Sequence, residues 1–268
     1  MKRRPRRPIE TTLAPAALGV MLMLPAAAAR GNDAAAKGLE IARSSEKANE
    51  GFGTERATMT LELINAHGDV TRRKMRLEIL EGTTDGDRSL SVFDWPADVK
   101  GTKLLTFTHK KADDDQWLYL PAVKRVKRIS SNNKSGSFMG SEFAYEDLAG
   151  QELEKFTYRY LDDQKVDGRD CWRIQRTPVH SGSGYKRQVT WTDKEYLGPV
   201  KIEFYDRKDE LLKVSTFAGY KRQGKFWRWT KITMDNVQTK KKSILTWEAR
   251  ELGAKLDASR FDSAALEE

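Results

Sequence analysis

The chain has 268 residues, of which 48 are Lys or Arg and 39 are Asp or Glu, so its net charge is +9. This length is compatible with one large all-β domain. The single cysteine, Cys171, excludes an internal disulfide framework, and stability must therefore come from a packed core.

The first 29 residues have the pattern of a secretory signal peptide. Five Lys or Arg among the first seven residues precede an apolar stretch from Leu13 to Leu24 and the small residues 26–29. The apolar stretch is too short to cross a bilayer. We therefore predict export with cleavage near Ala29, by a Sec or a twin-arginine route.

Loss of this leader changes the charge of the chain. It removes five basic residues and one acidic residue, which leaves 43 Lys or Arg against 38 Asp or Glu and a balance of +5. This mild charge on an exported protein argues against nucleic-acid binding. It suits an anionic membrane surface or an acidic partner.

After the leader, the chain predicts one helix and then a long series of strands. Residues 34–50 form a loosely amphipathic helix that Gly51 and Gly53 end. From residue 58 onward the apolar residues alternate with polar ones, and about eleven strands follow one another with hairpin-length connections. This pattern favours an antiparallel meander. No linker divides it, so we expect a single domain over residues 30–268.

A mainly β sheet of this size should curl strongly, and its concave face must be filled or covered. The predicted helix and a short segment at 142–148 are too little to fill it, so we expect a cavity. The large apolar residues expected on the concave face are Phe93, Trp95, Leu105, Phe107, Val189, Trp191, Ile202, Phe204, Ile232 and Met234.

No motif in the chain favours an enzyme or a metal site. The three histidines lack metal-ligand spacing, and the HSGSG stretch at 180–184 differs from a nucleophile motif. Cys171 begins a strand and suits a packed small residue. The acidic runs at 113–115 and 162–163 lie in turns, where Asp bonds to backbone groups. We predict no catalytic residue, no metal and no cofactor, although carboxylates that meet only in three dimensions stay an open alternative.

The stretch WLYLPAVKRVKRIS, at 117–130, joins an apolar strand to a basic segment. Trp117 and Tyr119 lie on one face of the strand and Leu118 and Leu120 on the other, and either pair could face the cavity. The basic segment predicts either an edge strand protected from aggregation or a rim for lipid headgroups or an acidic partner. Its four basic residues are Lys124, Arg125, Lys127 and Arg128.

The next apolar residues lie in a loop rich in Gly and Ser. Phe138 and Met139 stand between glycines, where they either plug a cavity or bind an apolar ligand. The following SEFAYEDL, at 141–148, predicts a short helix with Ser141 as its N-cap. Its inward residues would be Phe143, Tyr145 and Leu148. Together these features predict a lid over the concave face.

The combination WLYLPAVKRVKRIS…SFMGSEFAYEDL resembles the signature of the outer-membrane lipoprotein-sorting protein family, whose fold is similar to that of the lipoprotein carrier LolA. The resemblance extends from the first helix to LDASRF at 256–261. It implies a strongly curved, LolA-like antiparallel half-barrel closed by a short helical lid. It also implies a non-enzymatic periplasmic carrier of a lipid or lipoprotein between the inner and outer membranes.

By analogy, the resemblance also implies partners and a site. The partners would be an inner-membrane exporter of the resistance-nodulation-division (RND) type and, transiently, the membrane surface. Asp147 would anchor the lid by capping or by pairing with a rim Arg. The cavity and lid would be formed by Trp95, Phe107, Trp117, Leu118, Tyr119, Leu120, Phe138, Met139, Phe143, Tyr145 and Leu148. The rim would consist of Lys124, Arg125, Lys127 and Arg128.

Several alternatives stay open at this point. The cargo could be a lipoprotein, a hopanoid, a phospholipid or a glycolipid. The protein could instead be an envelope sensor that binds lipoprotein or lipopolysaccharide, or a secreted enzyme acting on an envelope polymer. A structural protein that binds an acidic polymer through its basic rim would be favoured by a cavity too small for an acyl chain.

Overall fold

The computed structural model describes residues 26–130 and 133–267. Most of the predicted signal peptide, residues 1–25, lies outside these ranges. Helix α1 (Ala26–Asn49) begins eight residues before the predicted helix and includes the end of the predicted leader. In the part of the chain that the structure describes, no helix is long and apolar enough to cross a membrane.

Thirteen strands form one antiparallel sheet in the order β6-β5-β4-β3-β2-β1-β15-β14-β11-β10-β9-β8-β7. Two further strands, β12 (Lys221–Gln223) and β13 (Phe226–Arg228), form a separate hairpin. The thirteen are β1 (Thr54–Ile64), β2 (Val70–Leu80), β3 (Arg88–Trp95), β4 (Lys103–Phe107), β5 (Asp115–Leu120), β6 (Arg125–Ile129), β7 (Phe156–Val166), β8 (Arg169–Pro178), β9 (Tyr185–Asp193), β10 (Pro199–Asp206), β11 (Leu211–Ala218), β14 (Lys231–Asn236) and β15 (Lys242–Leu252).

The number of strands is therefore higher than the predicted eleven or so. The basic segment, which we interpreted either as an edge strand or as a rim, contains the edge strand β6, hydrogen-bonded to β5. The alternating stretch 227–237 is divided between two strands, β13 and β14, which belong to different sheets. Backbone pairing decides both cases, and an edge strand such as β6 can pair without apolar alternation.

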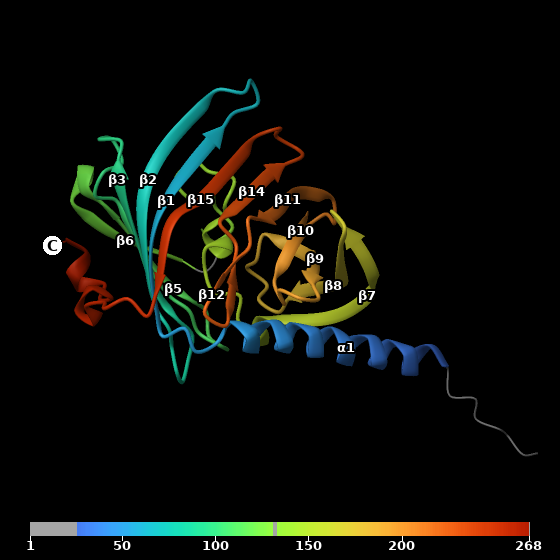
Figure 1. Cartoon of the computed structure of the whole chain (residues 1–268). Coiled ribbons are helices and arrows are strands. Elements are labelled where there is room, and N and C mark those ends of the chain that lie inside the picture. The colour runs from blue at the N-terminus through green and yellow to red at the C-terminus, as the bar shows by residue number, and fades with distance from the viewer. Residues whose placement is uncertain (1–25, 131–132, 268) are drawn as a thin grey trace, which may run out of the picture.

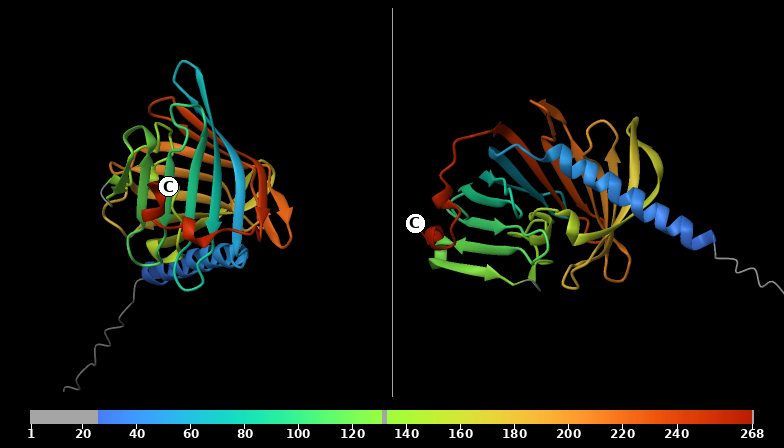
Figure 2. Two further views of the ribbon diagram at one scale, coloured as in Figure 1. Left: turned by 90° about the vertical axis from the view of Figure 1, so that its left-hand side faces the viewer. Right: turned by 90° about the horizontal axis from the view of Figure 1, so that it is seen from below.

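The sheet is strongly curved and does not close into a barrel (Figures 1 and 2). Neighbouring strands are mostly joined by short turns, and β1 pairs with β15, which joins the N-terminal and C-terminal halves of the sheet. The edges are β6 and β7. The mainly β class and the open curved antiparallel sheet are confirmed.

Helix α1 covers the β7 edge of the sheet (Figure 2). It packs closely because Gly38 is buried against the strand. A Cβ atom at Gly38 would lie only 2.7 Å from the backbone nitrogen of Tyr160 in β7. One turn further along the helix, Ile41 is also buried. The helix thus protects an edge that would otherwise offer unpaired backbone groups.

The largest apolar cluster fills the concave face of the sheet. It includes Phe93, Ile202, Phe204 and Met234, as predicted, and Ile232 packs against it. Val189 and Trp191 instead pack in a separate cluster with Cys171, because Thr190 is the residue of β9 that pairs with Ile202. For these two residues of β9 the predicted face is wrong.

A third cluster lies on the opposite face of β3 to β5. Leu105 and Phe107, predicted to face inward, pack here under Phe261 and Leu266 of the C-terminal segment. This segment lies beside β6 (Figure 1). The prediction is wrong because it left out the C-terminal residues, which make the convex face of these strands apolar as well. Trp95, also predicted to face inward, is 51% exposed and belongs to none of the three clusters.

Candidate functional site

The concave face encloses a cavity of about 210 Å³. Its walls are apolar side chains of β1, β2, β4, β14 and β15, with serines and threonines of β3 and β4 between them. Trp229 and Trp247 also line it. The remaining wall comes from residues 133–150, which we call the lid segment, through Phe138, Phe143, Asp147 and Leu148.

The lid segment begins with a tight hairpin. The Phe138 amide donates to the Phe143 carbonyl at 2.8 Å, and the Ser141 amide donates to the Phe138 carbonyl at 2.9 Å. Met139 and Gly140, at the tip, have positive φ angles of 50° and 77°. Such angles favour glycine, so Met139 adopts a strained conformation that the surrounding contacts must maintain.

Aromatic contacts hold this hairpin on the concave face. Phe138 is 2% exposed and stacks on Phe93 of β3, with ring centroids 5.7 Å apart. Tyr145 meets the other side of Phe138 edge-on, also at 5.7 Å. Phe143 is 3% exposed. The burial of Phe138 at the cavity is what the plug interpretation of the sequence expects.

The end of the lid segment differs from the predicted helix. Only Tyr145–Asp147 form a single 3₁₀ turn, and the Asp147 carboxylate accepts the Ala144 amide at 2.7 Å. Ser141 is not the cap. Its hydroxyl donates to the Phe138 carbonyl at 2.7 Å and so stabilises the hairpin. Asp147 does cap, but its cationic partner is not an Arg of the rim.

That partner is Lys213 of β11. Its ammonium group donates to Asp147 Oδ2 at 2.7 Å and to the Glu142 carbonyl at 2.9 Å. Tyr185 of β9 donates its hydroxyl to Asp147 Oδ1 at 2.8 Å, and burial raises the pKa of Tyr185 well above its ordinary value. Lys213 stands at an inward position that pairs with Phe204 of β10, where alternation predicts an apolar residue. That displaced charge is the sequence signal that we missed.

Further hydrogen bonds fix the lid segment to distant strands. Asn236 of β14 donates to the Glu142 carboxylate at 2.7 Å, and the Glu142 amide donates to Ser243 of β15 at 3.0 Å. On the other side, Gln116 of β5 donates to the Tyr145 carbonyl at 3.1 Å. We call the contacts of Lys213, Tyr185, Asn236 and Ser243 the polar latch. The latch joins the lid segment to four strands far from it in sequence.

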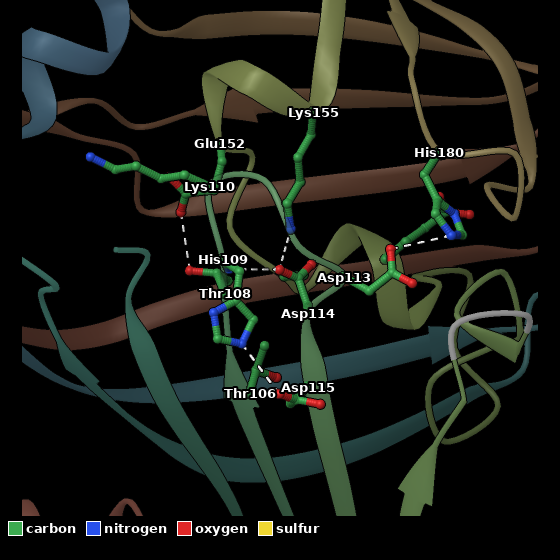
Figure 3. Close-up of polar contacts among 12 residues, drawn as sticks. Thr106, Thr108, His109, Lys110, Asp113, Asp114, Asp115, Glu152, Lys155 and His180 are labelled. Carbon is green, nitrogen blue, oxygen red and sulfur yellow. Dashed lines mark hydrogen bonds and ion pairs between the residues drawn. The ribbon is translucent and has the colours of Figure 1, made fainter. Parts of the chain in front are cut away.

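A second group of polar contacts holds the chain just after the lid segment (Figure 3). The Thr108 hydroxyl donates to the Glu152 carboxylate at 3.0 Å, and Lys155 pairs with Asp114. His180 of the β8–β9 turn approaches Asp113 at 3.2 Å. The β4–β5 turn is thereby joined to the β8–β9 turn across the end of the lid segment.

The structure also decides which face of β5 looks into the sheet. Leu118 belongs to the concave cluster that contains Phe138, and Leu120 packs against it. Trp117 and Tyr119 pack on the convex cluster beneath the C-terminal segment, together with Phe107. Met139, Tyr145 and Leu148 pack against the concave cluster.

Of the four predicted rim residues, three lie on β6, at the edge of the sheet, and Lys124 directly precedes this strand. All four are exposed, and none lines the cavity. Arg128 pairs with Asp115 of β5. Lys124 is the last residue of the β5–β6 turn, and its φ angle is positive, at 47°. These positions are compatible with both interpretations of the basic segment, a protected edge and a contact surface.

Asp147 lines the cavity, and its carboxylate is held by Lys213 and Tyr185. Within residues 26–130 and 133–267, no three His, Cys, Asp or Glu side chains are placed to hold a metal ion. Burial raises the pKa of the Cys171 thiol to about 11, which makes it a poor nucleophile. The site offers an apolar cavity, a fitted cover and a polar latch.

A curved open sheet with a covered apolar cavity defines a class of ligand-binding half-barrel proteins. A family model that carries the description of an uncharacterized protein matches residues 85–268. A domain from Vibrio parahaemolyticus, assigned to the outer membrane lipoprotein-sorting proteins, is 48% identical with a TM-score of 0.85, and the match covers 87% of this chain and all of that one. The chain belongs to this outer membrane lipoprotein-sorting family, as its sequence predicts.

Two more distant structures share the fold. A DUF1329 family protein from Desulfovibrio piger is 29% identical with a TM-score of 0.82, over 87% of this chain and 99% of that one. A LolA superfamily protein from Nitrosomonas europaea is 19% identical with a TM-score of 0.67, over 83% and 96% of the two chains. The latter likeness concerns the fold alone. No curated protein matches the chain.

Proposed function

We propose that this protein is a non-enzymatic periplasmic carrier that shelters the acyl chains of a lipid or lipoprotein between the inner and outer membranes. The observation that carries the proposal is the apolar cavity on the concave face, covered by a lid segment with its own polar latch. Family membership and the predicted export signal support it. An inner-membrane RND-type exporter, implied by the resemblance, would be the partner that loads or empties the carrier.

The volume of the cavity indicates whether the lid segment is open or closed. Its 210 Å³ is below the roughly 300–1,000 Å³ of ordinary ligand pockets. Such a volume would favour the polymer-binding alternative if the walls were fixed. Phe138 and Phe143, however, are themselves walls and belong to the lid segment, so their withdrawal would enlarge the cavity. We therefore assign the structure to a state in which the lid segment is closed.

In the proposed carrier, an acyl chain would take the place of the Phe138 and Phe143 rings in the cavity when the lid segment opens. An acyl chain gains about 0.8 kcal/mol for each CH₂ group it buries, so several methylenes can replace the apolar contacts of Phe138 and Phe143. The polar latch opposes opening until those contacts are replaced. A partner that binds the open lid segment would shift this equilibrium and release the cargo.

A variant that fills the cavity without touching the lid segment tests the proposal. Ser91 of β3 lines the cavity, and Ser91→Phe should occupy the space meant for an acyl chain. Lipid extraction and native mass spectrometry of protein isolated from its own periplasm would measure bound cargo. Cargo should co-purify with the natural protein and with the control Ser181→Phe, whose residue is exposed in the β8–β9 turn, and should be lost from Ser91→Phe.

The opposite results would count against a carrier. A natural protein that carries no lipid and takes up none when lipids are added would contradict the proposal. Equal cargo on Ser91→Phe and Ser181→Phe, with both variants folded, would place the ligand outside the cavity.

A further inference from the structure

Four large apolar side chains are strongly exposed among the described residues, and three of them lie in the turns at one end of strands β1 to β6. Val70 is 42% exposed, Trp95 51% and Val123 60%. Val70 opens β2, Trp95 closes β3, and Val123 lies in the turn between β5 and β6. Strands β1 to β6 are neighbours in an antiparallel meander, so the β1–β2, β3–β4 and β5–β6 turns lie at the same end of these strands.

Pairing and packing join the three turns into one surface. Lys74 of β2 pairs directly with Trp95. A side-chain atom at Gly101, in the β3–β4 turn, would lie 3.6 Å from Pro121 in the β5–β6 turn. We call Val70, Trp95 and Val123 the apolar rim. The β1–β2 hairpin projects beyond the neighbouring strands at this end of the molecule (Figure 1).

Basic side chains surround the apolar rim. Residues 69–76, 94–103 and 121–127 together contain nine Lys or Arg and three Asp, a balance of +6. Of the three acidic residues, Asp94 accepts hydrogen bonds from Nε and Nη2 of the Arg76 guanidinium. Glu62, outside these ranges, pairs with Arg72 at 2.7 Å. The surface therefore stays positive after its own ion pairs are counted.

We propose that the apolar rim docks on the surface of a bilayer that contains anionic phospholipid. A Trp with aliphatic neighbours suits the region between headgroups and acyl chains, and Lys and Arg are attracted by the negative headgroups. A protein interface would instead present a contiguous apolar centre. The rim consists of separate side chains on projecting turns, which suits shallow insertion into a fluid surface.

Docking in this way brings the lid segment to the membrane. Arg73 of β2 donates to the Met139 carbonyl at 2.5 Å, at the tip of the lid hairpin. A side-chain atom at Gly140 would lie 4.0 Å from Leu63, near the end of β1. The tip of the lid segment thus lies at the same end of strands β1 and β2 as the apolar rim. Its role in cargo transfer rests on the proposed carrier function, whereas docking itself needs no cargo.

The fourth exposed side chain supplies a matched control. Val179 is 60% exposed, like Val123. It precedes His180, which approaches Asp113 at 3.2 Å in the β4–β5 turn. That turn is at the opposite end of β5 from Val123, and a six-residue strand spans about 20 Å. Val123→Ser and Val179→Ser therefore remove equally exposed side chains from different ends of the molecule.

Vesicle co-sedimentation tests the proposal. The purified protein should bind vesicles of phosphatidylglycerol and phosphatidylcholine, bind pure phosphatidylcholine poorly, and dissociate at high salt. Trp95→Ser/Val123→Ser should weaken binding to the mixed vesicles about tenfold, with Val179→Ser unchanged. Trp95→Phe, which keeps an aromatic ring, should retain binding but lose part of the fluorescence quenching by brominated lipid.

Each contrary result overturns the docking proposal. Absence of binding by the natural protein, or equal loss in the rim and Val179 variants with all chains folded by circular dichroism, would contradict it. If the natural protein self-associates and does not bind vesicles, and the variants of the apolar rim abolish the self-association, the apolar rim would instead bind a second copy of the chain. The cavity-filled Ser91→Phe should still dock, so loss of cargo and loss of docking are separable.

Discussion

Lys213 of β11 and Asp147 of the lid segment form an ion pair of 2.7 Å whose side chains are 5% and 6% exposed. The Tyr185 hydroxyl donates to Asp147 Oδ1, and the Ala144 amide donates to Oδ2, the oxygen that Lys213 also binds. A buried pair of this kind is sensitive to loss of one partner, because the other is then a charge without compensation. The ion pair therefore stabilises the closed lid segment only while both Lys213 and Asp147 are present.

The first prediction concerns this pair. Lys213→Met should lower the free energy of unfolding by about 3–5 kcal/mol, because Asp147 would stay buried without its cation. Urea unfolding would measure the loss. The double variant Lys213→Met/Asp147→Leu should recover part of it.

An exposed pair supplies the control. Arg76 and Asp94 are 48% and 40% exposed, so Arg76→Met should cost no more than about 1 kcal/mol. Equal losses for the Lys213 and Arg76 variants would mean that the latch adds nothing to the closed state.

The second prediction separates the plug from the ordinary core. Phe138 and Phe261 are both 2% exposed, but only Phe138 lines the cavity. Phe138→Ala should speed hydrogen exchange in the lid segment and increase uptake of a fluorescent fatty acid. Phe261→Ala should lower the global free energy of unfolding by about 3–5 kcal/mol and leave uptake unchanged. A lid segment that stays fully protected in Phe138→Ala would show that it does not open separately.

A third prediction follows from the contact between α1 and β7. Gly38→Ala places a methyl group 2.7 Å from the Tyr160 amide nitrogen, so it should lower the melting temperature. Gly31 lies in the same helix with open space around it. Gly31→Ala should stabilise by up to about 1 kcal/mol through helix propensity. If the two substitutions act alike in thermal unfolding, the helix does not rest tightly on β7.

The fourth prediction is a pH dependence. Burial raises the pKa of Asp87, in the β2–β3 turn, to about 6, and the charges of Glu152 and Glu81 add to the rise. Because this exceeds the ordinary value of 3.8, the folded protein binds more protons than the unfolded chain between these pH values. The contribution of Asp87 to stability therefore falls as pH rises through this window.

Asp87→Asn isolates this effect, since an amide oxygen can still accept the Gly82 amide that Asp87 binds at 2.9 Å. The variant should be more stable than the natural protein at pH 7.5, and the difference should shrink toward pH 4. Urea unfolding at several pH values would measure it. Parallel pH profiles for the two proteins would exclude Asp87 as a source of the dependence.

Local patterns in the sequence determined the class of the fold and the family. Alternation between polar and apolar residues is a local property, so it predicts strands and an antiparallel meander without knowledge of their partners. The segment from Trp117 to Leu148 likewise identified the family, and it placed Phe138 in a lid over the concave face. The predicted leader lies mostly outside the described residues.

Only the tertiary structure decided which face of each strand is inside and what holds the lid. Leu105 and Phe107 face outward because the C-terminal segment covers them, a contact between residues about 150 positions apart that no local pattern contains. The Lys213–Asp147 pair joins positions 66 residues apart. The alternating pattern does not predict a lysine on the inward face. A buried lysine is tolerated there only because the folded lid segment supplies the Asp147 carboxylate as its partner.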